Sequence, residues 1–182
     1  LSAGGSANGI VASGVSSFTG GITNAGTITG GQGAIFVGDQ LLAGQQSRFD
    51  FGGGISNSGA IGATNNGIFV GATLEHASTL TISTFAGGIA NSGSIEGTSR
   101  GIIVGGFVRD SSNLTISSFP NSIANSGTIA GGFVGIVVGG TATSHSTITI
   151  SSFGGGISNS GAITATSGLG VFVGGVASTH AS

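Results

Sequence analysis

Apolar residues return at the same positions every 33 or 34 residues along this chain. Each repeat can be counted from a phenylalanine, which is followed four and ten residues later by isoleucine; these phenylalanines are Phe18, Phe51, Phe85, Phe119 and Phe153. Every repeat also has glycine at its eighth position and asparagine at its sixth, namely Asn24, Asn57, Asn91, Asn125 and Asn159. Disordered low-complexity segments have no reason to keep apolar residues in phase, so this period predicts stacked structural repeats.

Within each repeat, the spacing of apolar residues is typical of strands and not of helices. The repeat from Phe51 contains three short runs, GISNSGAI (54–61), GIFVG (67–71) and TLTIST (79–84), rich in β-branched residues and separated by Gly, Ser and Asn. Helices tolerate glycine poorly, and this chain has 40 glycines. Three strands per repeat predict an all-β fold: a right-handed parallel β-helix, or three-sided β-solenoid, of about five coils of ~34 residues.

We expect one β-solenoid domain over residues 1–182, with partial units at 1–17 and 153–182 and whole units at 18–50, 51–84, 85–118 and 119–152. In such a stack, identical residues lie above one another and form ladders along the axis. The phenylalanines are expected inside. The asparagines are expected to link their amides from coil to coil at a left-handed corner, with the following glycine allowing the turn. An amide-lined binding row is the functional alternative.

The second run breaks the alternation that a half-exposed strand should show. Positions 17 and 19 of the repeat are apolar and belong inside, so position 18 must point outward, yet it is also apolar: Phe36, Phe69, Ile103, Val137 and Phe172. A continuous outward stripe of this kind usually marks a contact. These five residues, called the position-18 stripe below, predict a protein–protein interface for lateral self-association. The alternative is that a loop of the same chain, 108–113 or 40–46, covers them.

Charge and cysteine content exclude several classes of protein. The chain has three Arg, no Lys, five acidic residues and no Cys. A nucleic-acid partner is not expected because counterion release needs clustered cations. Without cysteine, there are no disulfides or thiolate sites. No apolar run approaches the ~18 residues of a membrane span, so we expect no membrane insertion by this chain.

Few residues suggest chemistry. The acidic residues occupy different repeat positions, so a carbohydrate-active β-helix enzyme, whose carboxylates must cluster, is a low-ranking alternative; they are Asp39, Asp50, Glu75, Glu96 and Asp110. His76, His145 and His180 fall near one corner, and His145 and His180 could share an ion, but no complete ligand set accompanies them. We therefore expect no enzyme activity, metal or cofactor. An ice-binding solenoid is another low-ranking alternative, because a row of outward-facing threonines resembles the surfaces of such proteins; the row is Thr81, Thr115 and Thr149.

The GGISNSGAI…GIFVG pattern resembles the Gly-, Asn- and Ser-rich repeats in passenger domains of bacterial autotransporters, the type V secretion proteins, over nearly the whole chain. The resemblance implies an extracellular or bacterial cell-surface location, export through a C-terminal β-barrel in the outer membrane, and a role in adhesion or surface structure. We therefore expect a non-enzymatic structural or adhesive protein that self-associates laterally or end to end, with a host or surface molecule as a further ligand. The alternative is a self-assembling subunit of an extracellular filament or sheath.

Overall fold

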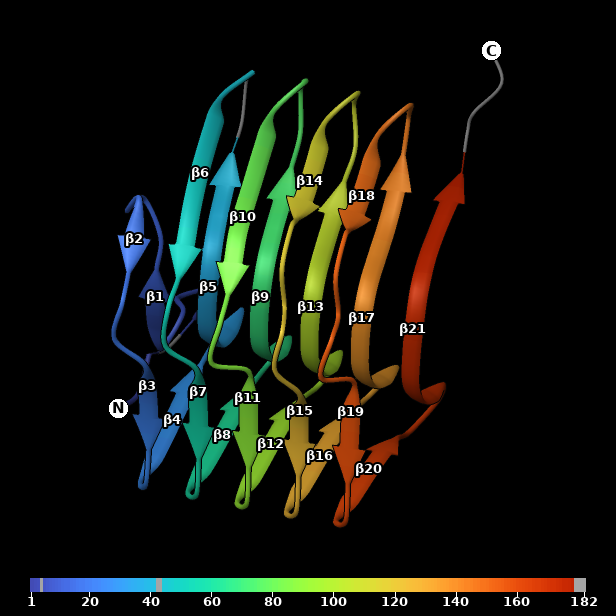
Figure 1. Cartoon of the computed structure of the whole chain (residues 1–182). Helices are drawn as coiled ribbons and strands as arrows, with labels where there is room; N and C mark the ends of the chain where they lie inside the picture. Colours follow the sequence, from blue (N-terminus) through green and yellow to red (C-terminus); the bar gives the residue numbers. More distant parts are fainter. Residues whose placement is uncertain (4, 42–43, 179–182) are drawn as a thin grey trace.

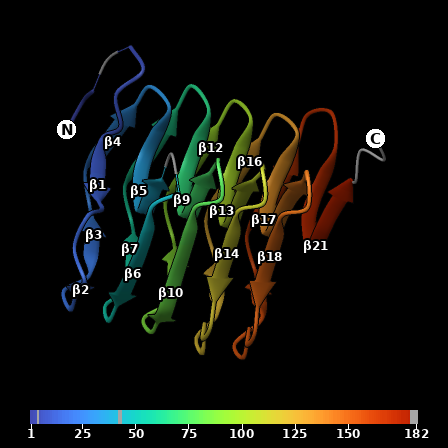
Figure 2. The ribbon, with the colours of Figure 1, turned by 90° about the horizontal axis from the view of Figure 1, so that it is seen from above.

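The chain winds into a stack of coils built from short parallel strands (Figure 1). The computed structural model describes residues 1–3, 5–41 and 44–178. Across these residues it contains strands and turns but no helix, and hence no helix able to cross a membrane. The strands form four parallel sheets, and successive coils follow one another along the stack, from blue to red in Figure 2.

Two sheets contain the longer strands of each coil. The six-stranded sheet, called the long sheet below, contains β1 (Ile10–Ala12), β5 (Gly33–Leu41), β9 (Asn66–Leu74), β13 (Arg100–Val108), β17 (Val134–Thr143) and β21 (Leu169–Ser178). A five-stranded sheet contains β2 (Ser17–Phe18), β6 (Gln46–Phe51), β10 (Thr79–Phe85), β14 (Asn113–Ile116) and β18 (Thr147–Ile150).

The other two sheets meet at the asparagine corner. One contains β3 (Ile22–Asn24), β7 (Ile55–Asn57), β11 (Ile89–Asn91), β15 (Ile123–Asn125) and β19 (Ile157–Asn159). The other contains β4 (Thr27–Gly30), β8 (Ala60–Ala63), β12 (Ser94–Gly97), β16 (Thr128–Gly131) and β20 (Ala162–Ala165).

These sheets confirm the expected all-β solenoid of about five coils, with one correction to the number of strands. A complete coil has four strands, because the first expected run, 54–61, is divided into β7 and β8 by a corner at Ser58 and Gly59. The right-handed sense and the three-sided cross-section stay predictions.

Strand pairing explains why nearly the same sequence recurs in every repeat. Each strand pairs with the equivalent strand of the next coil, so that Ile55 lies beside Ile89 and Ile89 beside Ile123. The register shifts within one pair, β6 and β10, at Ile82 to Thr84. Identical side chains therefore stack along the axis, and those that point inward form one continuous apolar core. Burial of this core is the main stabilising contribution to the fold.

Glycines in the middle of the long strands set the shape of the long sheet. Gly38, Gly71, Gly105, Gly139 and Gly174 lie side by side, each with φ between 125° and 142°. A β-carbon at Gly71 would lie 1.6 Å from the carbonyl oxygen of Gly105 in the next coil, so a larger residue cannot fit. Such glycines mark a bend in a strand, and the long strands are bowed along their length in Figure 1.

Candidate functional site

The phenylalanine ladder lies inside the solenoid. Phe51, Phe85 and Phe119 are fully buried, whereas Phe18 and Phe153 in the outermost coils are partly buried. The ring centroids of Phe85 and Phe119 are 4.8 Å apart and their planes differ by 2°, so the rings are stacked along the axis. These phenylalanines are part of the hydrophobic core, and their side chains offer no polar or reactive group to a ligand.

The asparagine ladder is a row of linked side-chain amides. In each of four steps, Nδ2 of one asparagine donates a hydrogen bond of 2.7 Å to Oδ1 of the next, from Asn24 through Asn57, Asn91 and Asn125 to Asn159. The first four asparagines are buried. Each of these four also donates from Nδ2 to two backbone carbonyls at the corner, as Asn91 does to Gly93 and Thr128. The ladder is thus a fully used internal network and not an open binding row.

The backbone at this corner differs from the expectation. Each asparagine ends a strand, and no asparagine is among the described residues with positive φ. The glycine two residues later is needed for space: a β-carbon at Gly93 would lie 2.0 Å from the carbonyl oxygen of Gly59. Left-handed residues occur instead at the corner after the long strands, in the pairs His76 and Ala77, Asp110 and Ser111, and Ser144 and His145.

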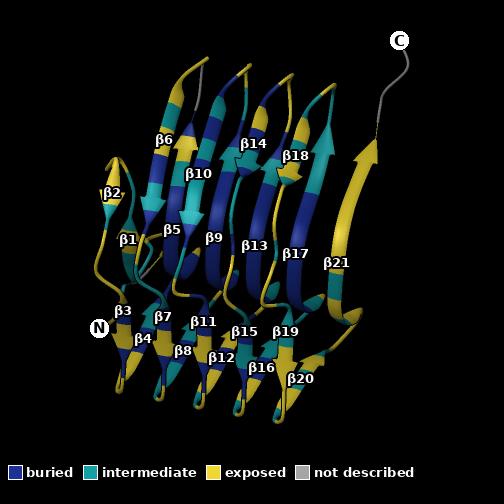
Figure 3. Ribbon diagram, in the orientation of Figure 1, coloured by how far each residue is buried: buried dark blue, intermediate teal, exposed yellow. Residues whose placement is uncertain are grey.

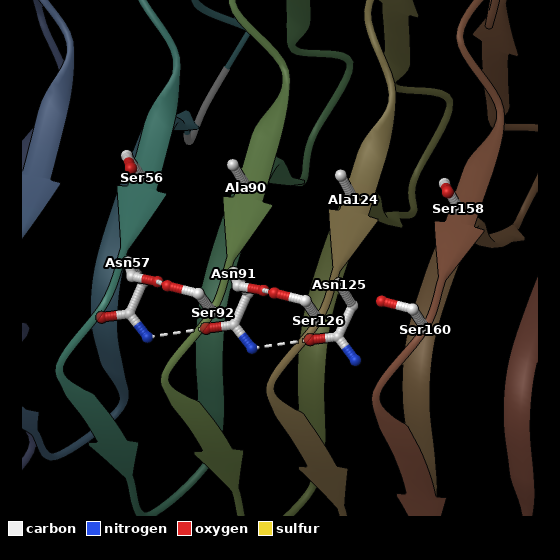
Figure 4. Close-up of a pocket in the computed structure, with 10 residues that line it drawn as sticks. All are labelled: Ser56, Asn57, Ala90, Asn91, Ser92, Ala124, Asn125, Ser126, Ser158 and Ser160. Atoms are coloured by element: carbon white, nitrogen blue, oxygen red, sulfur yellow. Dashed lines mark hydrogen bonds between the residues drawn. The ribbon is translucent and has the colours of Figure 1, made fainter.

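A shallow polar trough runs along the outside of the asparagine corner (Figure 4). It has a volume of about 220 Å³ and is lined by two rows of small residues beside the asparagines: Ser56, Ala90, Ala124 and Ser158 in one row, and Ser92, Ser126 and Ser160 in the other. The hydroxyls of Ser92 and Ser126 donate to backbone carbonyls of the preceding coil at 3.4 Å. The trough therefore offers a regular array of hydroxyls, one coil apart.

The position-18 stripe points away from the main core, as expected, but it is not an exposed surface. Phe36, Phe69, Ile103 and Val137 are only 1–6% exposed and form a second apolar cluster. Phe107, Val134 and Phe172, all in the long sheet, pack against it. Four of the five side chains are therefore shielded from solvent within the chain itself, and the protein–protein interface at this stripe stays a prediction.

That one of the two loops, 108–113 or 40–46, covers the stripe stays a prediction. Val108, at the start of one loop, packs in the main core. The other loop, 40–46, includes Leu42 and Ala43, which lie outside the described residues. Stacking of equivalent side chains along the axis contributes to the burial, as in the edge-on contact between the rings of Phe36 and Phe69, whose centroids are 5.3 Å apart.

The outer face of the long sheet also carries a groove over β13, β17 and β21, with a volume of about 250 Å³. Its lining includes three registered rows of residues, which are Arg100, Val134 and Leu169; Ile103, Val137 and Phe172; and Phe107, Thr141 and Val176. Leu169 and Val176 are each 54% exposed, so the groove is apolar and open to solvent. Periodicity does not predict this groove. The sequence feature that indicates it is a departure from the repeat, because Arg100 stands where the preceding coil has Asn66.

Arg100 lies at one end of this groove. Its guanidinium stacks on the ring of Phe107, 4.7 Å from the ring centroid, and Nη1 donates to the hydroxyl of Ser99 at 3.0 Å. Partial burial lowers the pKa of Arg100 by desolvation, but an arginine stays protonated at neutral pH. Among the described residues, no carboxylate pairs with it.

A smaller polar pocket, of about 80 Å³, adjoins the groove on the other side of Phe107. Amide side chains dominate its lining: Asn8, Gln32, Gln40, Asn65 and Asn66. The Oδ1 atom of Asn66 is buried and has no hydrogen-bond partner in the part of the chain that the structure describes. The outer face thus has a polar half and an apolar half, joined at Arg100 and Phe107.

The other charged and histidine residues form no candidate active or metal site within the described residues. Glu75 forms an ion pair with Arg109 and lies 3.9 Å from the imidazole of His76. His180 lies outside the described residues, so its expected proximity to His145 has no structural description. Within the described ranges, no three His, Cys, Asp or Glu residues are grouped in a way that could hold a metal ion. Thr81, Thr115 and Thr149 lie in register, but Arg48 takes the equivalent position in the coil before them.

Comparison with known proteins adds no family to this description. No protein-family model matches the chain, and neither a curated protein nor a solved structure shows significant similarity to it. The class of protein that the fold defines is therefore a repeat β-solenoid with an internal asparagine ladder.

Proposed function

We propose that this chain is a non-enzymatic structural and adhesive β-solenoid of an extracellular or bacterial-surface protein. The observation that carries the proposal is the polar trough, where small side chains repeat in register over successive coils beside a buried ladder (Figure 4). Rigid stacking fixes the positions of these hydroxyls before any ligand arrives, which lowers the entropic cost of binding a long polar surface. The resemblance to autotransporter passenger repeats supports the surface location.

Adhesion can be tested with protein labelled at its N-terminal amine, which is the only amine because the chain has no Lys. We expect the labelled protein to bind cultured epithelial cells or bacterial cells in flow cytometry. The double variant Ala90→Tyr and Ala124→Tyr fills the trough and should abolish binding. Thr81→Tyr with Thr115→Tyr, on a different sheet, is the matched control. Absence of cell binding by the wild type, or equal binding by the trough variant, contradicts an adhesive trough.

The second candidate is a subunit that assembles by coil-on-coil stacking, and the exposure of β21 favours it. Val171 and Val173 are 40% and 61% exposed, although the equivalent Ile136 and Val138 of the preceding coil are buried. Figure 3 shows this contrast between the strands, with β21 largely exposed and β17 largely buried. A further coil laid on β21 covers these side chains, and a second copy of the chain is one source of such a coil. Head-to-tail contacts of this type give open filaments.

Negative-stain microscopy and sedimentation distinguish the two candidates. Fibres whose length grows with protein concentration, and which disappear in Val173→Glu, support the assembling subunit. Isolated short particles at every concentration contradict it and leave adhesion to be judged by the cell-binding experiment.

A further inference from the structure

The groove over β13, β17 and β21 exists because the chain departs from its own repeat there. The position-18 stripe has phenylalanine in β5, β9 and β21, but Ile103 and Val137 in the two strands between them. Gly106 and Gly140 line the same groove where β9 has Ala72. Because Ile103 and Val137 are smaller than phenylalanine and the two glycines have no side chain, the surface is hollowed where phenylalanine rings would otherwise lie.

The charge at the end of this hollow is unusual for a chain with so few charges. Arg100 occupies a row whose neighbours are Asn66, Val134 and Leu169, so neither the repeat nor the fold requires a cation there. Its guanidinium is held against Phe107, partly desolvated and without a carboxylate partner among the described residues. A fixed, partly desolvated guanidinium favours a carboxylate, which it can bind through two parallel hydrogen bonds.

We propose that this groove binds a single-chain amphiphile with a carboxylate head group. The apolar tail lies across β17 and β21 between Val134, Val137 and Phe172, and the carboxylate pairs with Arg100. Successive strands are ~4.8 Å apart, so the tail crosses about 10 Å from Arg100 to β21, which suits a medium-length alkyl chain.

The polar pocket beside Phe107 is consistent with this orientation of the ligand. It places amide side chains, including the unpartnered Oδ1 of Asn66, on the head-group side of Arg100 and none on the tail side. The proposal does not depend on adhesion, because the groove lies on the long sheet and the trough lies on the asparagine corner.

The test is an NMR titration of isotope-labelled protein with sodium octanoate, with octanol as the uncharged probe of the same tail length. We expect octanoate to shift the methyl signals of Val134, Leu169 and Val176, and to bind at least tenfold more tightly than octanol. Shifts confined to other residues, or equal affinities for the two probes, overturn the proposal.

Two variants separate the head from the tail. Arg100→Gln should weaken octanoate binding about tenfold or more while leaving octanol binding unchanged, because a hydrogen bond to a charged group contributes at least this factor. Arg48→Gln removes an exposed cation from β6 and is the matched control, with no expected effect. Val137→Phe restores the ring found at this position in three other coils and should block both probes.

The variants also define the outcomes that overturn the proposal. If Arg100→Gln and Arg48→Gln weaken octanoate binding equally, the effect is general electrostatics and the proposed pairing is wrong. If Val137→Phe, with an unchanged circular dichroism spectrum, still binds octanol, the tail does not occupy the groove. If light scattering shows that the wild type dimerises and the groove methyl signals shift with protein concentration alone, a second copy of the chain is the occupant instead.

Discussion

Replacing Phe85 by alanine should remove one of the largest contributions to the stability of this solenoid. Its side chain is fully buried and stacked between two rings, with centroids 4.9 Å from Phe51 and 4.8 Å from Phe119. A buried phenylalanine costs ~3–5 kcal/mol on truncation to alanine. Each aromatic pair contributes on the order of 0.5–1.5 kcal/mol beyond its buried area. We therefore expect a loss at the upper end of the range, about 5 kcal/mol.

The loss can be measured by urea unfolding followed by far-ultraviolet circular dichroism, since the chain has no Trp or Tyr for fluorescence. With an m-value of ~2 kcal/mol/M, a loss of 5 kcal/mol lowers the unfolding midpoint by about 2–3 M. Phe133→Ala is the matched control, because that ring is 59% exposed and its truncation should change stability by less than ~0.5 kcal/mol. If Phe85→Ala does not fold, Phe85→Leu should fold with a smaller loss. A loss below about 1 kcal/mol for Phe85→Ala would refute the stacked interior.

Three further predictions concern the corners and the absence of metal. Gly93→Ala should lower the free energy of unfolding in urea by ~2–3 kcal/mol, because the added β-carbon would meet the backbone of the preceding coil. Gly62→Ala is the control, because Gly62 has open space around it and the change should be neutral or slightly stabilising. Equal effects of the two changes would contradict the close approach at Gly93. Asn91→Ala should cost ~2–3 kcal/mol because it removes the donor to the Oδ1 of Asn125 and to the backbone carbonyls of Gly93 and Thr128. Asn113→Ala, at an exposed position, should cost less than ~0.5 kcal/mol, and a similar loss in both variants would argue against the ladder. EDTA should leave the melting temperature unchanged, and a large drop would reveal a metal site.

The sequence predicted the fold class because each inward residue is repeated at its own position. Periodicity alone placed the isoleucines beside Asn57 and Asn91 in the core, and strand pairing confirms this arrangement. A corner was expected at Asn57 and Gly59, but the run 54–61 was still counted as a single strand, whereas the structure divides it into β7 and β8. The left-handed residues were assigned to asparagine by propensity, but Ala77 and Ser144, with little such preference, adopt that backbone instead.

The outer face was the hardest part to predict. Alternation correctly indicates that Phe69 points away from the main core, but it cannot indicate how much water reaches the ring. That depends on stacking against Phe36 and Phe107 and on the bend at Gly71, which are properties of the assembled sheet. The groove at Arg100 results from differences between coils, whereas periodicity indicates only the positions that the coils have in common.

The side-chain amides of the asparagine ladder all have the same orientation along the solenoid axis, so their dipoles are aligned. In all four steps the donor belongs to the earlier coil and the acceptor to the later one, and the additional bonds from Nδ2 to backbone carbonyls fix this orientation. Aligned amide dipoles polarise one another, so each bond in such a chain is strengthened by about 10–30%. The two ends of the row therefore differ: the Oδ1 of Asn24 accepts from the backbone N–H of Gly26 in its own coil, and the Nδ2 of Asn159 donates to the carbonyl of Gly161 in its own coil. A further coil that extended this row in the same way would have to place its asparagine oxygen against the Nδ2 of Asn159, so the ladder favours one direction of stacking as well as one register.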